Sequence, residues 1–198
     1  MKLILPILLV FIFFGCATKV PIATKYKLDS EINTKKIQDS KCSKESLKVL
    51  QSFSSSMLMS QKMYYVEDNN KIYPYSEAMW GDSPNKIVSK HLFEMLRESN
   101  LFYAVINSKS RIKTSWLLES KVEDFMQYYE NNLSSSYVKV TVDLTLIDSK
   151  TSQIVATNVF RSKIKVDALN AQGGVEAFSI ALTEILNDSS LWIYKQCQ

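Results

Sequence analysis

Side chains that could perform acid–base or metal chemistry are few in this sequence. His91 is the only histidine among 198 residues, so a histidine metal cluster is excluded and a Ser-His-Asp triad would depend on this one side chain. His91 falls on the apolar stripe of a predicted helix, and we interpret it as a structural histidine. Glu119, Glu123 and Asp124 could form a carboxylate pair, but strand parity separates Asp124 from the other two, and a solvated strand face accounts for them.

The sequence also contains no motif for binding phosphate or a metal. The chain has four glycines and no glycine-rich phosphate-binding loop. We therefore expect no catalytic residue, no metal and no cofactor, and an envelope hydrolase has no support beyond isolated polar side chains. The remaining chemistry belongs to three cysteines, at positions 16, 42 and 197.

The first of these cysteines follows a short export signal. Lys2 precedes an apolar run over residues 3–14. This run is about a dozen residues long, whereas a membrane-spanning helix needs roughly 20. We interpret residues 1–15 as a signal peptide. Gly15-Cys16 at its end resembles the lipobox of bacterial lipoproteins, although Phe13 stands where leucine is usual.

This resemblance implies that Cys16 is the lipid attachment site. Acyl chains such as palmitate would then hold the mature chain on a membrane. Ala17 resembles a signal for the outer membrane, with the domain facing the periplasm, whereas an aspartate there would suggest the inner membrane. The alternative is an ordinary signal peptide with an incidental cysteine.

The export signal places Cys42 and Cys197 in an oxidising compartment. A disulfide between them would close a loop of about 155 residues and stabilise the fold by roughly 4 to 5 kcal/mol in the chain-entropy model. Two unpaired thiols near the ends of the domain are the alternative.

Length and charge indicate one exported domain. Removing 15 of the 198 residues leaves 183, and removing Lys2 lowers the formal charge from +4 to +3. The basic residues are scattered, which argues against nucleic acid as a partner, while anionic lipid headgroups stay open. Residues 16–45 have the polar composition of a lipidated N-terminus and tether, with an apolar island at 26–28 that could pair as an edge strand. Residues 46–198 form the domain.

Apolar patterning predicts an α+β fold. Strands are expected at residues 46–53, 57–66, 71–75, 101–106, 114–126, 137–148 and 154–166, with a bulge near Glu123. Ser83-Pro84 begins a helix that stops at Asn100, and a turn at Gly173-Gly174 precedes a second helix over residues 175–194. This order indicates a mainly antiparallel sheet with two helices packed on one face.

An aromatic-rich region before the first helix is the candidate partner interface. It contains Tyr64, Tyr65, Tyr73, Tyr75, Met79 and Trp80. Tyr73, Tyr75 and Trp80 are the interface residues we favour, because large side chains with polar tips commonly anchor interfaces. The alternative is that the region is ordinary core. Tyr128-Tyr129 we expect at a flexible loop tip.

The order of these features resembles the auxiliary lipoproteins of ABC-type intermembrane lipid transport, over residues 24–195. The matching positions are Tyr26-Lys27-Leu28, Tyr73-Pro74-Tyr75, Trp80, Ser83-Pro84, Leu92, Leu96, Phe102, Val105, the strand at 118–125 and Trp192. Gly81-Asp82 and a polar early segment depart from the family pattern, and they leave open which transport system is served.

The resemblance implies a non-enzymatic adaptor that docks transport machinery at the outer membrane. Its partners would be an MCE-domain protein with an ABC permease and ATPase. A different role, as an assembly factor or activator of a peptidoglycan synthase or of outer-membrane protein machinery, is the alternative. The oligomeric state, including a homo-oligomer, stays open.

Overall fold

One sheet and two long helices form the described part of the chain, which comprises residues 22–30, 40–68, 70–130 and 133–198 of a computed structural model. The strands are β1 (Thr24–Tyr26), β2 (Ser46–Val49), β3 (Phe53–Ser54), β4 (Lys62–Glu67), β5 (Lys71–Trp80), β6 (Ala104–Asn107), β7 (Trp116–Glu130), β8 (Ser135–Asp148) and β9 (Gln153–Lys165). The helices are α2 (Pro84–Glu98) and α3 (Ala171–Gln196), and η2 (Lys41–Lys44) is a 3₁₀ turn. The signal peptide and Cys16 lie outside the described residues.

Strand β7 organises the sheet. Its whole length pairs with β8 in antiparallel fashion, and β8 pairs likewise with β9. Its other edge is shared by three short strands, β2, β3 and β4, which pair with it in turn and in parallel. The long strand pairs are antiparallel, and the short parallel pairs continue the sheet beyond the other edge of β7. The predicted α+β class is therefore confirmed.

The predicted bulge lies in β7, where the register to β8 shifts between Val122 and Asp124. The extra residue reverses the parity of the strand. Val122 and Phe125 consequently both face the core, at 1% exposure each. Asp124 turns to the opposite face, beside Lys139.

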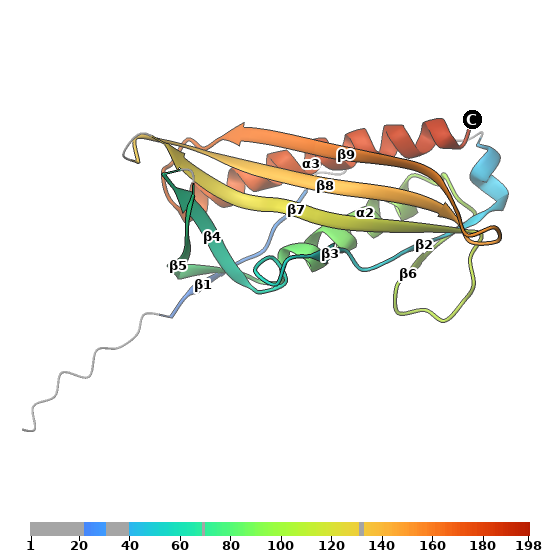
Figure 1. Ribbon diagram of the computed structural model, residues 1–198, viewed down its shortest axis with the longest axis horizontal. Coiled ribbons are helices and arrows are strands. Elements are labelled where there is room, and N and C mark those ends of the chain that lie inside the picture. The colour runs from blue at the N-terminus through green and yellow to red at the C-terminus, as the bar shows by residue number, and fades with distance from the viewer. Residues whose placement is uncertain (1–21, 31–39, 69, 131–132) are drawn as a thin grey trace, which may run out of the picture.

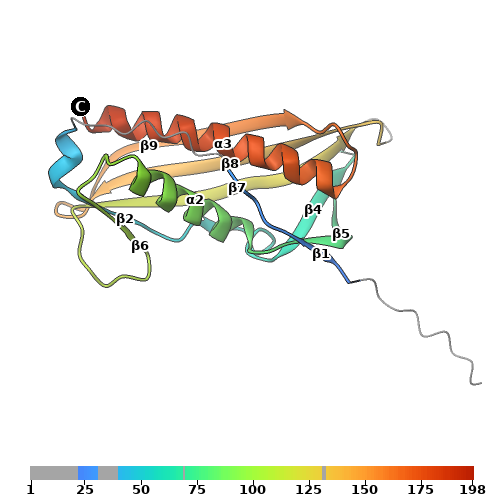
Figure 2. The ribbon, with the colours of Figure 1, turned by 180° about the vertical axis from the view of Figure 1, so that it is seen from behind.

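Both helices cover the same face of the sheet (Figure 2). Helix α3 packs on β8 and β9, and α2 packs on β2, β6 and β7. At the centre of the core, the rings of Trp80, Phe125 and Phe178 lie 4.6 to 5.6 Å apart between centroids. Their burial stabilises the docking of α3 on the sheet.

The ends of helix α2 follow the sequence signals in part. Pro84 occupies its first turn as expected, but the Ser83 hydroxyl donates to Asn85 Oδ1 at 2.6 Å and makes no capping bond. Asn100, with φ of 56°, takes the left-handed conformation that ends the helix, which confirms the predicted stop. The strand expected at residues 46–53 is two short strands, β2 and β3, and the hairpin arm expected at 71–75 continues as β5 to Trp80.

The turn predicted at Gly173-Gly174 is wrong, because both glycines lie inside α3. Asn170 caps that helix by accepting the Gly173 N–H at 2.9 Å. A Cβ on Gly174 would lie 2.2 Å from Gln127 Oε1. Glycine is thus required here for close packing of helix and sheet.

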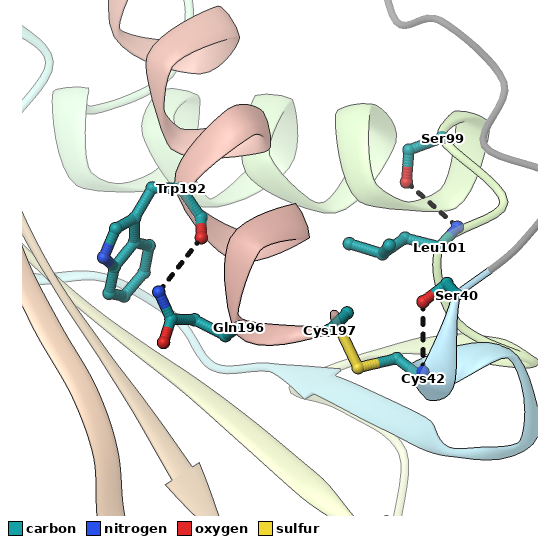
Figure 3. The surroundings of a disulfide bond; sticks show 7 residues. All are labelled: Ser40, Cys42, Ser99, Leu101, Trp192, Gln196 and Cys197. Atoms are coloured by element: carbon teal, nitrogen blue, oxygen red, sulfur yellow. Dashed lines mark hydrogen bonds between the residues drawn. A yellow bond between two sulfur atoms is a disulfide. The ribbon is translucent and has the colours of Figure 1, made fainter.

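The N-terminal segment packs on the domain. Strand β1 adds to β5 in parallel, and Leu28 is 3% exposed. The Lys41 N–H donates to the Cys197 carbonyl at 3.0 Å, and Cys42 and Cys197 are joined by a disulfide (Figure 3). Within the tether predicted at residues 16–45, the segments 22–30 and 40–45 therefore include residues that belong to the folded domain.

None of the helices that the structure describes is both long and apolar enough to cross a bilayer.

Candidate partner interface

The residues considered for acid–base chemistry have structural partners. His91 is 6% exposed, and its Nδ1 lies 2.8 Å from Ser30 Oγ. Burial lowers its pKa, and the nearby Glu94 carboxylate only partly offsets this effect. In the part of the chain that is described, no three His, Cys, Asp or Glu side chains group as a metal site would require.

The carboxylates of β7 hold the outer face of the sheet together. Asp124 accepts a hydrogen bond from the Tyr128 hydroxyl at 2.7 Å and an ion pair from Lys139 at 3.0 Å. Glu123 pairs with Lys121 at 3.0 Å on the same strand. Glu119 is exposed. Glu119 and Glu123 fit the predicted solvated strand face, whereas Asp124 is 9% exposed and does not. The predicted separation of Asp124 by strand parity is wrong, because the bulge places it on the same face as Glu119.

Four tyrosines from three strands gather where the β4–β5 hairpin meets the end of β7, and we call them the tyrosine cluster. Its members are Tyr65 of β4, Tyr73 and Tyr75 of β5, and Tyr129 of β7. The Tyr65 ring lies at the centre, with centroid distances of 5.7 Å to Tyr73, 4.6 Å to Tyr75 and 5.6 Å to Tyr129. Tyr73 lies directly opposite Tyr65 in the hairpin register.

The cluster rests on a buried hydrogen-bond network. The Tyr75 hydroxyl donates to Gln127 Oε1 at 2.9 Å and lies 2.8 Å from the Tyr129 hydroxyl. Gln127, which is 0% exposed, donates in turn to Ser136 Oγ at 2.9 Å. Burial, with a contribution from Tyr129, raises the pKa of Tyr75, so this hydroxyl stays protonated and can donate.

Exposure separates the three residues predicted for the interface. Tyr73 is 40% exposed, and its neighbour Ile72 is 43% exposed. Tyr75 is half-buried. Trp80 is 1% exposed and belongs to the core, so its assignment to the interface is corrected. Its indole packs edge-on against two phenylalanines and offers no surface to a partner.

A cavity of about 590 Å³ lies beside the cluster, between β1, β5 and the start of α3. Tyr26, Tyr75 and Tyr129 line it together with Glu77 and Leu169. Ile22, which is 96% exposed, lies at its edge. Apolar walls with hydroxyl and carboxylate groups suit binding of a surface that is partly polar and partly apolar.

Sequence reasoning missed Tyr129 and Gln127. Tyr128-Tyr129 was expected at a flexible loop tip, which is wrong, because β7 continues to Glu130 and pairs with β8 there. The stacked rings of Tyr128 and Tyr137, 5.1 Å apart, extend this pairing on the outer face. The sequence signal that could have placed these residues in a strand is the register between β7 and β8. Aligning the two strands sets Tyr128 opposite Tyr137.

Comparison with known proteins identifies a family. Residues 26–188 match the family model described as ABC-type transport auxiliary lipoprotein component. A search of functionally curated proteins finds no match.

Solved structures share the fold. A Xanthomonas campestris protein assigned to the family DUF330 superposes with a TM-score of 0.78 at 17% identity, over 88% of this chain and 96% of that one. An uncharacterised protein gives 0.67 at 14% identity, over 87% and 99% of the two chains. A hypothetical protein from Chlamydia trachomatis gives 0.53 at 5% identity, over 78% and 98%.

Proposed function

Because the chain belongs to the family of ABC-type transport auxiliary lipoprotein components, we propose that it is a non-enzymatic adaptor of an ABC/MCE-type intermembrane lipid transport system. As a family member it is a lipoprotein of the cell envelope that is associated with ABC-type transport. In our proposal Cys16 carries the lipid, the anchor lies in the outer membrane, and the domain docks an MCE-domain protein together with its permease and ATPase.

One observation carries this proposal: strand β1 and the β4–β5 hairpin, which bears three tyrosines of the cluster, lie at the same end of the molecule (Figure 1). Strand β1 pairs with the second half of β5, and the cavity beside the cluster is lined by residues of both strands. Six residue steps separate Cys16 from Ile22, so Ile22 lies within about 22 Å of the lipidated residue. A partner held by the tyrosine cluster would therefore be held close to the membrane.

The exposed residues of this end suit a protein partner. Tyr73 presents exposed aromatic area on the hairpin and rests on Tyr65, which limits the entropy lost when a partner packs against it. The buried network below fixes Tyr75 and Tyr129. A preformed aromatic surface of this kind binds without rearrangement.

Site-specific crosslinking tests the proposal. A photoreactive phenylalanine at position 73 should crosslink in cells to an MCE-domain protein, because Tyr73 faces outward beside the anchor. The matched control is position 103. Tyr103 is 80% exposed and directly precedes β6, at the other end of the sheet. Tyr73→Ala should lose the partner in a pull-down while Tyr103→Ala keeps it.

Two results would contradict this assignment. A crosslink from position 73 to a peptidoglycan synthase or to outer-membrane assembly machinery would favour the alternative role. Equal crosslinking from positions 73 and 103 would show that the tyrosine cluster is not the contact. Cys16→Ser separately tests the anchor, because the protein should then leave the membrane fraction.

A further inference from the structure

A second cavity, of about 630 Å³, lies at the opposite end of the sheet from the tyrosine cluster. It is formed by β2, the start of β7, the connection before β7 and the β8–β9 turn, which meet at one end of the molecule in Figure 1. Three lysines line it, namely Lys48, Lys113 and Lys150, and the other lining residues are mostly serine and threonine. We call it the lysine pocket.

Hydrogen bonds between its walls fix the lysine pocket. Ser46 Oγ accepts the Ser115 N–H at 3.1 Å, and the Ser149 N–H donates to the Ser115 carbonyl at 2.8 Å. Lys48 Nζ donates to the Ser110 carbonyl at 3.1 Å. The β2 strand, the connection and the turn are thus tied to one another. The pocket is preformed, so a ligand would not have to order its walls.

The residues that line the pocket include three lysines and no carboxylate. Among the described residues, none of its three lysines lies within 4.0 Å of a carboxylate oxygen. The connection adds Lys109 and Arg111. Asp148, the acidic residue of the turn, directs Oδ1 to the backbone N–H groups of Lys150 and Thr151, at 2.7 and 3.2 Å. An anion entering here would meet cations that are not already paired.

We propose that the lysine pocket binds a phosphate group. Lysine ammonium groups act as point charges toward phosphate oxygens, and three of them around one cavity match a tetrahedral anion with several oxygens. The volume exceeds that of a bare phosphate and accepts the rest of a phosphoester. Free phosphate and the phosphate of a lipid headgroup share this chemistry.

This site does not depend on the adaptor role. From Leu117 at the pocket to Tyr129 in the cluster, β7 runs twelve residue steps, or roughly 40 Å. A phosphate held here would be far from the tyrosine cluster. Loss of phosphate binding and loss of the protein partner can therefore be told apart by separate variants.

Calorimetric titration of the full chain in nonionic detergent at low ionic strength tests the site. Inorganic phosphate is one ligand, and glycerophosphoglycerol, the diester of a phospholipid headgroup, is the other. Lys113→Gln with Lys150→Gln should weaken binding by about tenfold, because two of the three charges are lost. The matched control is Lys62→Gln with Lys86→Gln, which removes two exposed lysines elsewhere and should leave the affinity unchanged.

Each outcome has a meaning. Tighter binding of the diester assigns the site to a headgroup, and tighter binding of inorganic phosphate assigns it to the free anion. Equal affinity in the wild type and the Lys113/Lys150 variant, or an equal loss in the control, would overturn the proposal. The single Lys113→Gln variant, expected to lose less than the double variant, repeats the test should the double variant not fold.

Discussion

At the residue scale, aromatic side chains a few positions apart have opposite tasks. Tyr73 has 40% of its surface exposed and rests on another ring, whereas Trp80 is 1% exposed within a cage of phenylalanines. Both belong to strand β5. The difference arises because the second half of β5 pairs with β1 and Trp80 packs against Phe178 of α3, whereas the half that bears Tyr73 pairs with β4 in the hairpin.

Replacing Trp80 by alanine should therefore unfold the domain more easily. We expect a loss of about 3 to 5 kcal/mol in the free energy of unfolding, since a large buried ring leaves a cavity behind. Tyr73→Ala should cost less than about 1 kcal/mol, as an exposed position does. Urea denaturation measures both losses. It is followed by far-ultraviolet circular dichroism, because this signal comes from the backbone and does not require Trp80. Equal losses would contradict the division into core and surface.

His91 makes stability depend on pH. Its pKa is lowered by burial from the ordinary 6.5. Below that value the histidine of the unfolded chain takes up a proton while His91 stays neutral, so the unfolded state binds more protons. Stability should consequently fall as pH drops from 6.5 to the lowered pKa, and be unaffected by this residue above 6.5.

Thermal unfolding between about pH 7.5 and about pH 5.5 checks this expectation. The comparison is His91→Gln, which retains a hydrogen-bonding group for Ser30 but does not titrate. On acidification, the melting temperature of the variant should decrease by less than that of the wild type. Parallel curves for the two proteins would show that His91 does not contribute.

The sequence could place single residues only where a local rule acts. Asn100 as a helix stop follows from its tolerance of positive φ, and the bulge near Glu123 follows from a change of parity within one strand. Tyr129 and Gln127 could not be found this way. Their roles depend on Tyr75, which is 52 residues or more away along the chain.

At the element scale, close contact between helix α3 and strand β7 rests on a missing side chain. Gly174 faces Gln127, which also holds Tyr75 and Ser136. Sequence patterning treats a pair of glycines as a turn, because glycine lowers helix propensity by about 1 kcal/mol. The tertiary contact overrides that preference, which explains why the predicted turn was wrong.

Gly174→Ala should destabilise the protein, although alanine favours helix. A Cβ 2.2 Å from Gln127 Oε1 must displace an amide that has two hydrogen-bond partners, at an expected net cost of about 1 to 3 kcal/mol. The control is Gln172→Ala, an exposed position two residues earlier, expected within about 0.5 kcal/mol of the wild type. Chemical denaturation distinguishes them, and a stabilised Gly174→Ala would refute the packing explanation.

Hydrophobic patterning in the sequence predicts the pairing of the long strands but not that of the short ones. The long strands β7, β8 and β9 follow one another along the chain and alternate apart from the bulge in β7, so their antiparallel order could be predicted from the sequence. The short strands β2, β3 and β4 pair with β7 in parallel across 60 residues or more. No local pattern encodes such pairing, because it depends on where the chain returns after a helix or a hairpin.

At the scale of the whole molecule, the disulfide closes nearly the entire domain. Cys42 and Cys197 are separated by 155 positions, and both are buried. Replacing both by alanine should cost roughly 4 to 5 kcal/mol, since the unfolded chain regains the freedom that the closed loop denies it. Urea unfolding measures the loss.

A reductant provides the control for this expectation. It should lower the stability of the wild type and leave the double alanine variant unchanged. If the wild type and the variant unfold at the same urea concentration, the loop does not stabilise the domain. The sequence could pair these two cysteines because they are the only ones left after Cys16.

The same bond sets how the molecule responds to tension. A pull on the N-terminal segment that is resisted at the C-terminus runs through Cys42 and the two sulfur atoms to Cys197, and bypasses the residues between them. The three paired residues of β1 take the load first and can peel away from β5. The rest of the sheet then carries no tension. The domain keeps its shape while the segment that contains β1 extends.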